Sequence, residues 1–187
     1  MTSALLNLDN SNQYLASNEV SSKHEEHYQA FLSALKDKNY FDGLDANSEG
    51  YKNKETKAKQ KFLKGLAELY KDKGNALLTQ KDAASCRSAI SLYEVAIKLS
   101  PSHTYYNNMA TAHYVVKQYK DSAEASRNAI LLDPKFAKAY LRLAMAQEKL
   151  GEYDDAILNY DKSNELAPSD ATLKLKQDCI NAKQTSQ

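Results

Sequence analysis

Two basic side chains, Lys138 and Arg142, stand four residues apart in the segment KFAKAYLRLA, just after Pro134. The alanine, tyrosine and leucine residues around them are typical of a helix. Residues four apart share a helix face, so both cations point the same way with no acid between them. Their mutual repulsion contributes nothing to folding, whereas together they can bind two carboxylates. The pair therefore predicts a site for an acidic ligand from another chain.

Three more polar residues fall in the same register. Lys71 and Asn75 are again four apart, in AELYKDKGNALL, and Asn108 in HTYYNNMATAHY lies 34 residues before Arg142. If these three helices lie side by side, three cations and two amides converge. Such a cluster can bind a ligand with two neighbouring carboxylates, and each well-formed charged hydrogen bond to them is worth about 1.5–3 kcal/mol. The asparagines add N–H donors without adding charge.

The elements that must position these side chains repeat along the chain. Small residues recur at Gly74, Ala110 and Ala144, of which the last two are 34 residues apart, and a proline closes each unit. This period, with small residues where two helices cross, is that of the tetratricopeptide repeat (TPR), a helix–turn–helix unit. We therefore predict an all-α solenoid in which the first helix of each unit lines a concave groove. The first unit is longer, with a stretched turn predicted at TQKDAASCRS.

Four regions follow from this pattern. Residues 1–20 are rich in Asn and Ser and are predicted to be disordered, and residues 21–65 form a helical extension that begins at Ser21 and is interrupted by DGLDANSEG. Three repeats occupy residues 66–168, and residues 169–187 form a capping helix and tail. The apolar residues of 1–65 either bind a second partner or fold back on the repeats.

Composition narrows the function classes. The 25 basic and 24 acidic residues nearly cancel, so no bulk attraction to nucleic acid or membrane is expected, and no apolar run is long enough to span a bilayer. The tyrosines fall at repeat packing positions such as Tyr93 and Tyr160, which favours a core over an RNA-stacking surface. Cys86 and Cys179 lie far apart, as expected of free thiols in the cytoplasm, with access to the nucleus left open.

The sequence gives little support to an enzymatic or a metal-binding function. The chain contains no phosphate-binding loop, nucleophile elbow or metalloprotease motif, so neither an enzyme nor a cofactor is predicted. His24 and His27 are spaced to share a metal, but without a third ligand nearby they are interpreted as an exposed helix face, and no metal site is predicted.

The polar pattern also resembles a known family. Lys-x-x-x-Asn, Asn and Lys-x-x-x-Arg are similar to the carboxylate clamp of TPR co-chaperones. The segments KDKGNALL, YYNNMATAHY and AILLDPKFAKAYLRLAMAQEKLGEYDDAI most resemble the small glutamine-rich TPR co-chaperones and the first TPR domain of heat-shock organising proteins. Over about residues 66–183, this implies a non-enzymatic adaptor that binds the C-terminal Glu-Glu-Val-Asp tail of heat-shock protein 70, heat-shock protein 90 or both. The clamp residues it implies are Lys71, Asn75, Asn108, Lys138 and Arg142.

Thr111, Tyr114 and Val115 follow Asn108 on one helix and are candidates to line a pocket for the residue of the bound tail that precedes its acidic end.

Some features of that family are not carried over. The sequence shows no glutamine-rich half after the repeats, and residues 1–65 show no convincing copy of the family's dimerisation domain, so client binding and dimerisation are not carried over from the resemblance. The alternative function is a TPR scaffold that binds an internal peptide or helix, with the cations serving a general acidic surface.

Overall fold

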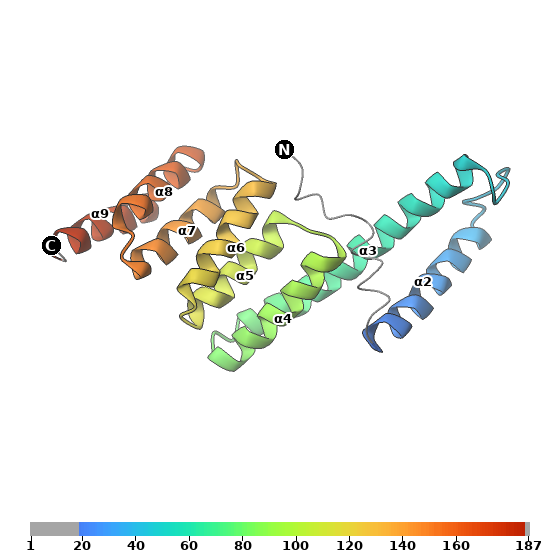
Figure 1. Ribbon diagram of the computed structural model, residues 1–187, viewed down its shortest axis with the longest axis horizontal. Coiled ribbons are helices and arrows are strands. Elements are labelled where there is room, and N and C mark those ends of the chain that lie inside the picture. Colours follow the sequence, from blue (N-terminus) through green and yellow to red (C-terminus); the bar gives the residue numbers. More distant parts are fainter. Residues whose placement is uncertain (1–18, 186–187) are drawn as a thin grey trace. The chain divides into compact units, whose positions relative to one another are not determined.

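The computed structural model describes residues 19–185. Within them eight helices and no strand are found, which confirms the predicted all-α class (Figure 1). The chain divides into two compact units, one up to Leu69 together with Lys98–Pro101, the other comprising Tyr70–Ile97 and the chain from Ser102 onward. The helices are α2 (Glu19–Asp37), α3 (Glu49–Leu78), α4 (Ala83–Leu99), α5 (His103–Val115), α6 (Tyr119–Leu132), α7 (Ala137–Leu150), α8 (Tyr153–Leu166) and α9 (Asp170–Thr185).

The first unit holds α2 and most of α3. Its α2 begins at Glu19, two residues before the predicted start, so the disorder predicted for residues 1–20 otherwise falls on residues outside the described part. Leu32 of α2 is buried with Ala58 of α3, and the ring of Phe62 lies 5.3 Å from that of Tyr28. Burial, with the nearby carboxylate of Glu55, raises the pKa of Tyr28 to about 12. The apolar stripe of the predicted helical extension is thus the core of this unit.

The histidine pair near the start of α2 differs from its interpretation. His24 is only 7% exposed, whereas His27 is exposed. The reading of both as an exposed face was therefore wrong for His24. Side chains three residues apart on a helix point about 60° away from each other around its axis, so one can lie on the buried face and the other just outside it.

The second unit contains the repeats. Helix α5 packs on α6, α6 on α7, α7 on α8 and α8 on α9, and the first helices α5 and α7 also contact each other directly. Ala110 and Ala144, two of the aligned small residues, are fully buried where the helices cross. The predicted repeat architecture is confirmed, and the small residues are what allow the helix axes to approach closely.

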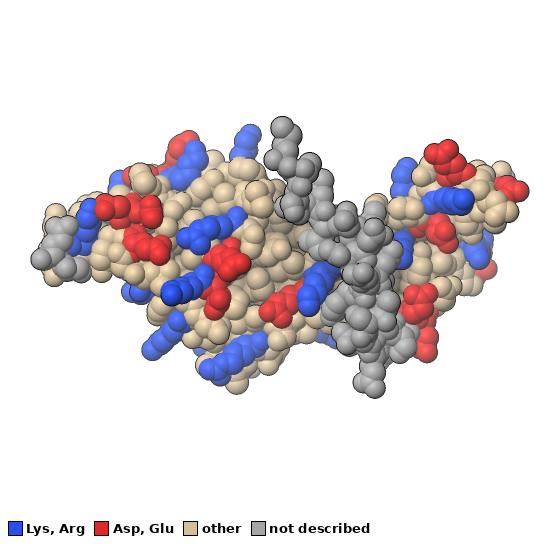
Figure 2. Space-filling model, in the orientation of Figure 1, with Lys and Arg blue, Asp and Glu red and all other residues tan. Residues whose placement is uncertain are grey.

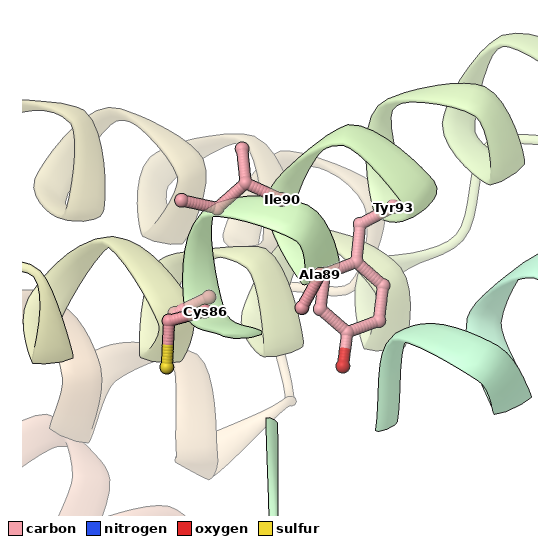
Figure 3. Close-up of a cluster of buried hydrophobic side chains, with 5 residues drawn as sticks. Cys86, Ala89, Ile90 and Tyr93 are labelled. Carbon is pink, nitrogen blue, oxygen red and sulfur yellow. The ribbon is translucent and has the colours of Figure 1, made fainter. Parts of the chain in front are cut away.

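The first repeat shows most clearly why a small residue is needed. A Cβ atom added to Gly74 would lie 2.7 Å from Cε1 of Tyr93, closer than real Cβ contacts. Tyr93 is fully buried on α4, where Cys86, Ala89 and Tyr93 project from one side of the helix (Figure 3). The absence of a side chain at Gly74 thus lets the Tyr93 ring lie against α3.

The stretched turn predicted in this repeat is not found. Helix α4 already begins at Ala83, so only residues 79–82 connect it to α3. Asp82 explains the early start, because its Oδ1 accepts hydrogen bonds from the backbone N–H groups of Ala84 at 3.0 Å and Ser85 at 2.9 Å. Such a side chain satisfies N–H groups that an uncapped helix start leaves open. The additional residues therefore form an extra helical turn at the start of α4, which buries Cys86.

Helix α9 closes the stack as the predicted capping helix. Its Cys179 is fully buried against Ala144, Ala156 and Tyr160. Lys176 also pairs with Asp161 of α8 at 2.6 Å, an exposed ion pair worth at most about 1 kcal/mol. The contact between α8 and α9 thus combines apolar burial with ion pairs at the surface. None of the described helices combines the length and apolar character needed to cross a membrane.

Candidate peptide-binding site

All five predicted clamp residues lie in the second unit, each on the first helix of a repeat. Lys71 and Asn75 belong to α3, Asn108 to α5, and Lys138 and Arg142 to α7. Asn108 Nδ2 donates a hydrogen bond to Asn75 Oδ1 at 2.8 Å, which joins α3 to α5, while α5 contacts α7. The structure therefore brings the two asparagines together directly and places the cations of α7 on the next first helix.

The amide groups of the clamp belong to a chain of hydrogen bonds. Asn75 Oδ1 also accepts the hydroxyl of Tyr93 at 2.8 Å, and Asn108 Oδ1 accepts Nδ2 of Asn107 at 3.4 Å. Both side-chain oxygens of the clamp asparagines are thus occupied. Each amide nitrogen has two N–H donors, and within the described residues Asn75 uses neither and Asn108 only one. The pair can therefore offer N–H donors to a ligand, as a carboxylate requires.

Arg142 is a half-buried cation on α7. In the part of the chain that the structure describes, no carboxylate lies within ion-pair distance of it, and its Nη1 donates only to Sδ of Met145 at 3.5 Å. Burial lowers the pKa of Arg142, opposed by the nearby phenol of Tyr114, but a guanidinium remains protonated at neutral pH. Removing a charge from water without a partner is unfavourable, so a bound anion would be stabilised here.

The two lysines differ in their surroundings. Lys138 is exposed one helical turn before Arg142 and has no ion-pair partner among the described residues. Lys71 has 22% of its side chain exposed, and its Nζ lies 2.9 Å from Oδ1 of Asp72, which is 65% exposed. Because the Asp72 carboxylate is largely in solvent, water screens its attraction to Lys71. Basic and acidic side chains are interspersed on the face that Figure 2 shows, in keeping with the near balance of 25 basic and 24 acidic residues in the sequence.

The three predicted pocket residues are placed differently from one another. Burial raises the pKa of the Tyr114 phenol, which lies near Arg142, and its ring packs edge-on against Tyr119 with the ring centroids 5.4 Å apart. Thr111 Oγ1 donates to the backbone oxygen of Asn107 at 3.0 Å, within its own helix. Val115 packs against the buried cluster of α4. Of the three, Tyr114 is the one that lies near enough to a clamp residue to affect its pKa, that of Arg142.

Two residues of this hydrogen-bond chain were not predicted from the sequence. Tyr93 was interpreted only as a packing residue, and Asn107 was not considered for the site. A tyrosine where phenylalanine would pack equally well is a signal for a hydroxyl contact, yet it is ambiguous. Tyr160, at the same repeat position, donates instead to Oε2 of Glu148 at 2.8 Å.

Successive helix pairs with buried small residues at their crossings, closed by a capping helix, define a TPR solenoid. The family model for the tetratricopeptide repeat matches residues 137–170, which hold α7 and α8. The structure of the Arabidopsis OM64 TPR domain is similar, with 32% identity and a TM-score of 0.58 over 62% of this chain and 94% of that domain. The chain belongs to the tetratricopeptide repeat family.

Within this family, the chain is similar to TPR proteins of particular kinds. The small glutamine-rich tetratricopeptide repeat-containing protein 2 of Mycosarcoma maydis is 38% identical over 109 residues, which cover 58% of this chain and 30% of that protein. The chain spans less than half of the length of the curated relatives it matches. The second TPR of Spaghetti (RPAP3), bound to the HSP90 peptide SRMEEVD, is 25% identical with a TM-score of 0.54 over 57% of this chain and 96% of that one. The predicted resemblance to small glutamine-rich TPR proteins is confirmed.

Proposed function

We propose that this protein is a non-enzymatic co-chaperone or adaptor that binds the C-terminal Glu-Glu-Val-Asp tail of heat-shock protein 70 or heat-shock protein 90. The observation that carries the proposal is the half-buried guanidinium of Arg142 on α7, which has no carboxylate partner among the described residues. The neighbouring helix α5 carries Asn108, which donates one N–H to Asn75, so that within the described part of the chain the oxygens of both asparagines are occupied while three of their four amide N–H groups are not. The likeness to small glutamine-rich TPR proteins supports it, as does the RPAP3 domain whose bound peptide ends in the same four residues.

The chemistry of such a tail matches the site. Its terminal aspartate carries a main-chain and a side-chain carboxylate, both of which accept hydrogen bonds. We propose that Lys71, Asn75 and Asn108 bind one carboxylate, and that Lys138 and Arg142 bind the other. The planar guanidinium suits two-point contact with a carboxylate. Because the guanidinium is already half-buried in the folded protein, ligand binding has less water to remove from it. A cytoplasmic location accords with this function, and both cysteines are buried free thiols.

Fluorescence anisotropy with a labelled peptide ending in Glu-Glu-Val-Asp tests the proposal. We expect low-micromolar binding, about −7 to −8 kcal/mol, that collapses when the same peptide is C-terminally amidated. Arg142→Ala should weaken binding by about ten- to a hundredfold, since it removes charged hydrogen bonds of about 1.5–3 kcal/mol. Arg127→Ala is the matched control, because it removes the same charge from an exposed position on α6.

The possible outcomes separate the two functions considered for this fold. Equal binding of the free and amidated peptides would refute a terminal-carboxylate clamp and favour a scaffold that recognises an internal segment. Loss of binding in Arg127→Ala as large as that in Arg142→Ala would indicate general electrostatic attraction. Absence of binding to either peptide would refute the proposed function.

A further inference from the structure

We propose that Tyr93 is a positioning residue of this site, whose hydroxyl sets the direction of the hydrogen-bond chain so that the amide N–H groups of Asn75 face the ligand. This inference rests on the proposed function. Tyr93 lies on α4, the second helix of the first repeat, and reaches Asn75 on α3 across the helix crossing.

The position of Tyr93 leaves its hydroxyl little freedom. The residue is fully buried, and its ring lies against the bare backbone of Gly74, next to Asn75. Its side chain projects from α4 on the same side as Cys86 (Figure 3). Burial also raises the pKa of Tyr93, so the phenol stays protonated and able to donate at neutral pH.

The hydrogen-bond chain has two conceivable directions. In the observed direction Tyr93 and Asn108 donate to Asn75, Asn107 donates to Asn108, and Oδ1 of Asn107 is a buried acceptor without a partner in the described residues. If all three amides turned over, Asn108 would donate to the Asn107 oxygen, and the Asn107 nitrogen would take the buried position where that oxygen now has no partner. The amide of Asn75 would then donate inward and turn its oxygen toward the ligand, where it would repel a carboxylate.

The hydroxyl of Tyr93 opposes this reversal. Its oxygen can accept a hydrogen bond from a reversed Asn75, but its own proton would then be buried without an acceptor. An unpaired buried donor is costly, so the reversed direction would leave both this proton and the amide N–H groups of Asn107 unsatisfied, whereas the observed direction leaves only the Asn107 oxygen. Replacing Tyr93 with phenylalanine removes the hydroxyl donor to Asn75 Oδ1, so that Asn108 alone holds this oxygen away from the ligand.

The test compares Tyr93→Phe with Tyr160→Phe in the full chain. Both tyrosines are fully buried at the same repeat position and donate a 2.8 Å hydrogen bond, but Tyr160 donates to Glu148, outside the predicted clamp. Thermal unfolding should show comparable losses of stability. Only Tyr93→Phe should weaken binding of the Glu-Glu-Val-Asp peptide, by about five- to tenfold.

Two further measurements distinguish positioning from packing. In an Asn75→Ala background, Tyr93→Phe should no longer change affinity, because the hydroxyl acts through Asn75. The side-chain amide signals of Asn75 and Asn108 in ¹⁵N NMR spectra of the free protein should move in Tyr93→Phe and stay in place in Tyr160→Phe.

Each result decides one of the two proposals. Unchanged affinity in Tyr93→Phe, an equal loss in Tyr160→Phe, or the same loss in the Asn75→Ala background would overturn the positioning role. If the unaltered protein fails to bind the peptide, the proposed function is refuted. The side-chain amide NMR signals of Asn75 and Asn108 then test the positioning role of Tyr93 independently of binding. Their movement in Tyr93→Phe alone would uphold control of Asn75 by Tyr93, and unmoved signals would overturn it.

Discussion

Replacing Gly74 with alanine sets two effects of known size against each other. In a helix interior alanine is favoured over glycine by about 1 kcal/mol. The new Cβ would, however, lie 2.7 Å from Cε1 and 3.0 Å from Cζ of Tyr93. The ring is fully buried and cannot swing away, and overpacking of this kind costs about 1–3 kcal/mol. Because the overlap involves several ring atoms, we place the penalty in the upper part of that range and expect a net destabilisation of about 1–2 kcal/mol.

Gly65 provides the matched control on the same helix. An added Cβ there meets nothing within 4 Å, so Gly65→Ala should stabilise by about 0.5–1 kcal/mol. Urea unfolding followed by far-UV circular dichroism should therefore show midpoints that move in opposite directions. Gly74→Ala should also weaken peptide binding, because a displaced ring withdraws the Tyr93 hydroxyl from Asn75. A midpoint for Gly74→Ala at or above that of the unaltered protein would refute the close approach of α3 and α4.

Two other expectations concern the first turn of α4 and the buried thiols. Asp82→Ala should lower the thermal midpoint at pH 7, whereas Asp82→Asn, which keeps an acceptor, should change it little. Hydrogen bonding by Ser85 lowers the pKa of Asp82, so its stabilising effect is present above about pH 4 and is lost as the pH falls through the lowered pKa. Thermal scans of Asp82→Ala and the unaltered protein should therefore converge in acid, and a constant difference would contradict the cap. Burial raises the pKa of the thiols of Cys86 and Cys179, so both should react with DTNB at pH 8 only as the protein unfolds; rapid labelling of the native protein would contradict their packing.

Much of the fold was predictable because each repeat places small and apolar residues at regular spacings along the sequence. A period of 34 residues aligned Ala110 with Ala144, and both are fully buried at helix crossings. The same alignment put Asn108 and Arg142 at equivalent places on successive first helices. The prediction of a stretched turn was wrong because the polar residues of that segment occur in loops and at helix starts equally well. Asp82 decides between them through hydrogen bonds to Ala84 and Ser85 that no periodicity reports.

By itself, the sequence determined which helix face each candidate side chain occupies and that five polar residues recur at related positions. Periodicity encodes this information, because the turn of a helix is constant. Tertiary structure alone decided how these residues are held. Asn75 meets Tyr93 and Asn108, which lie 18 and 33 residues away in the chain. Hydrogen bonds over such separations, and the half-burial of Arg142, depend on how neighbouring helices pack, so the direction of the amide chain exists only in the folded protein.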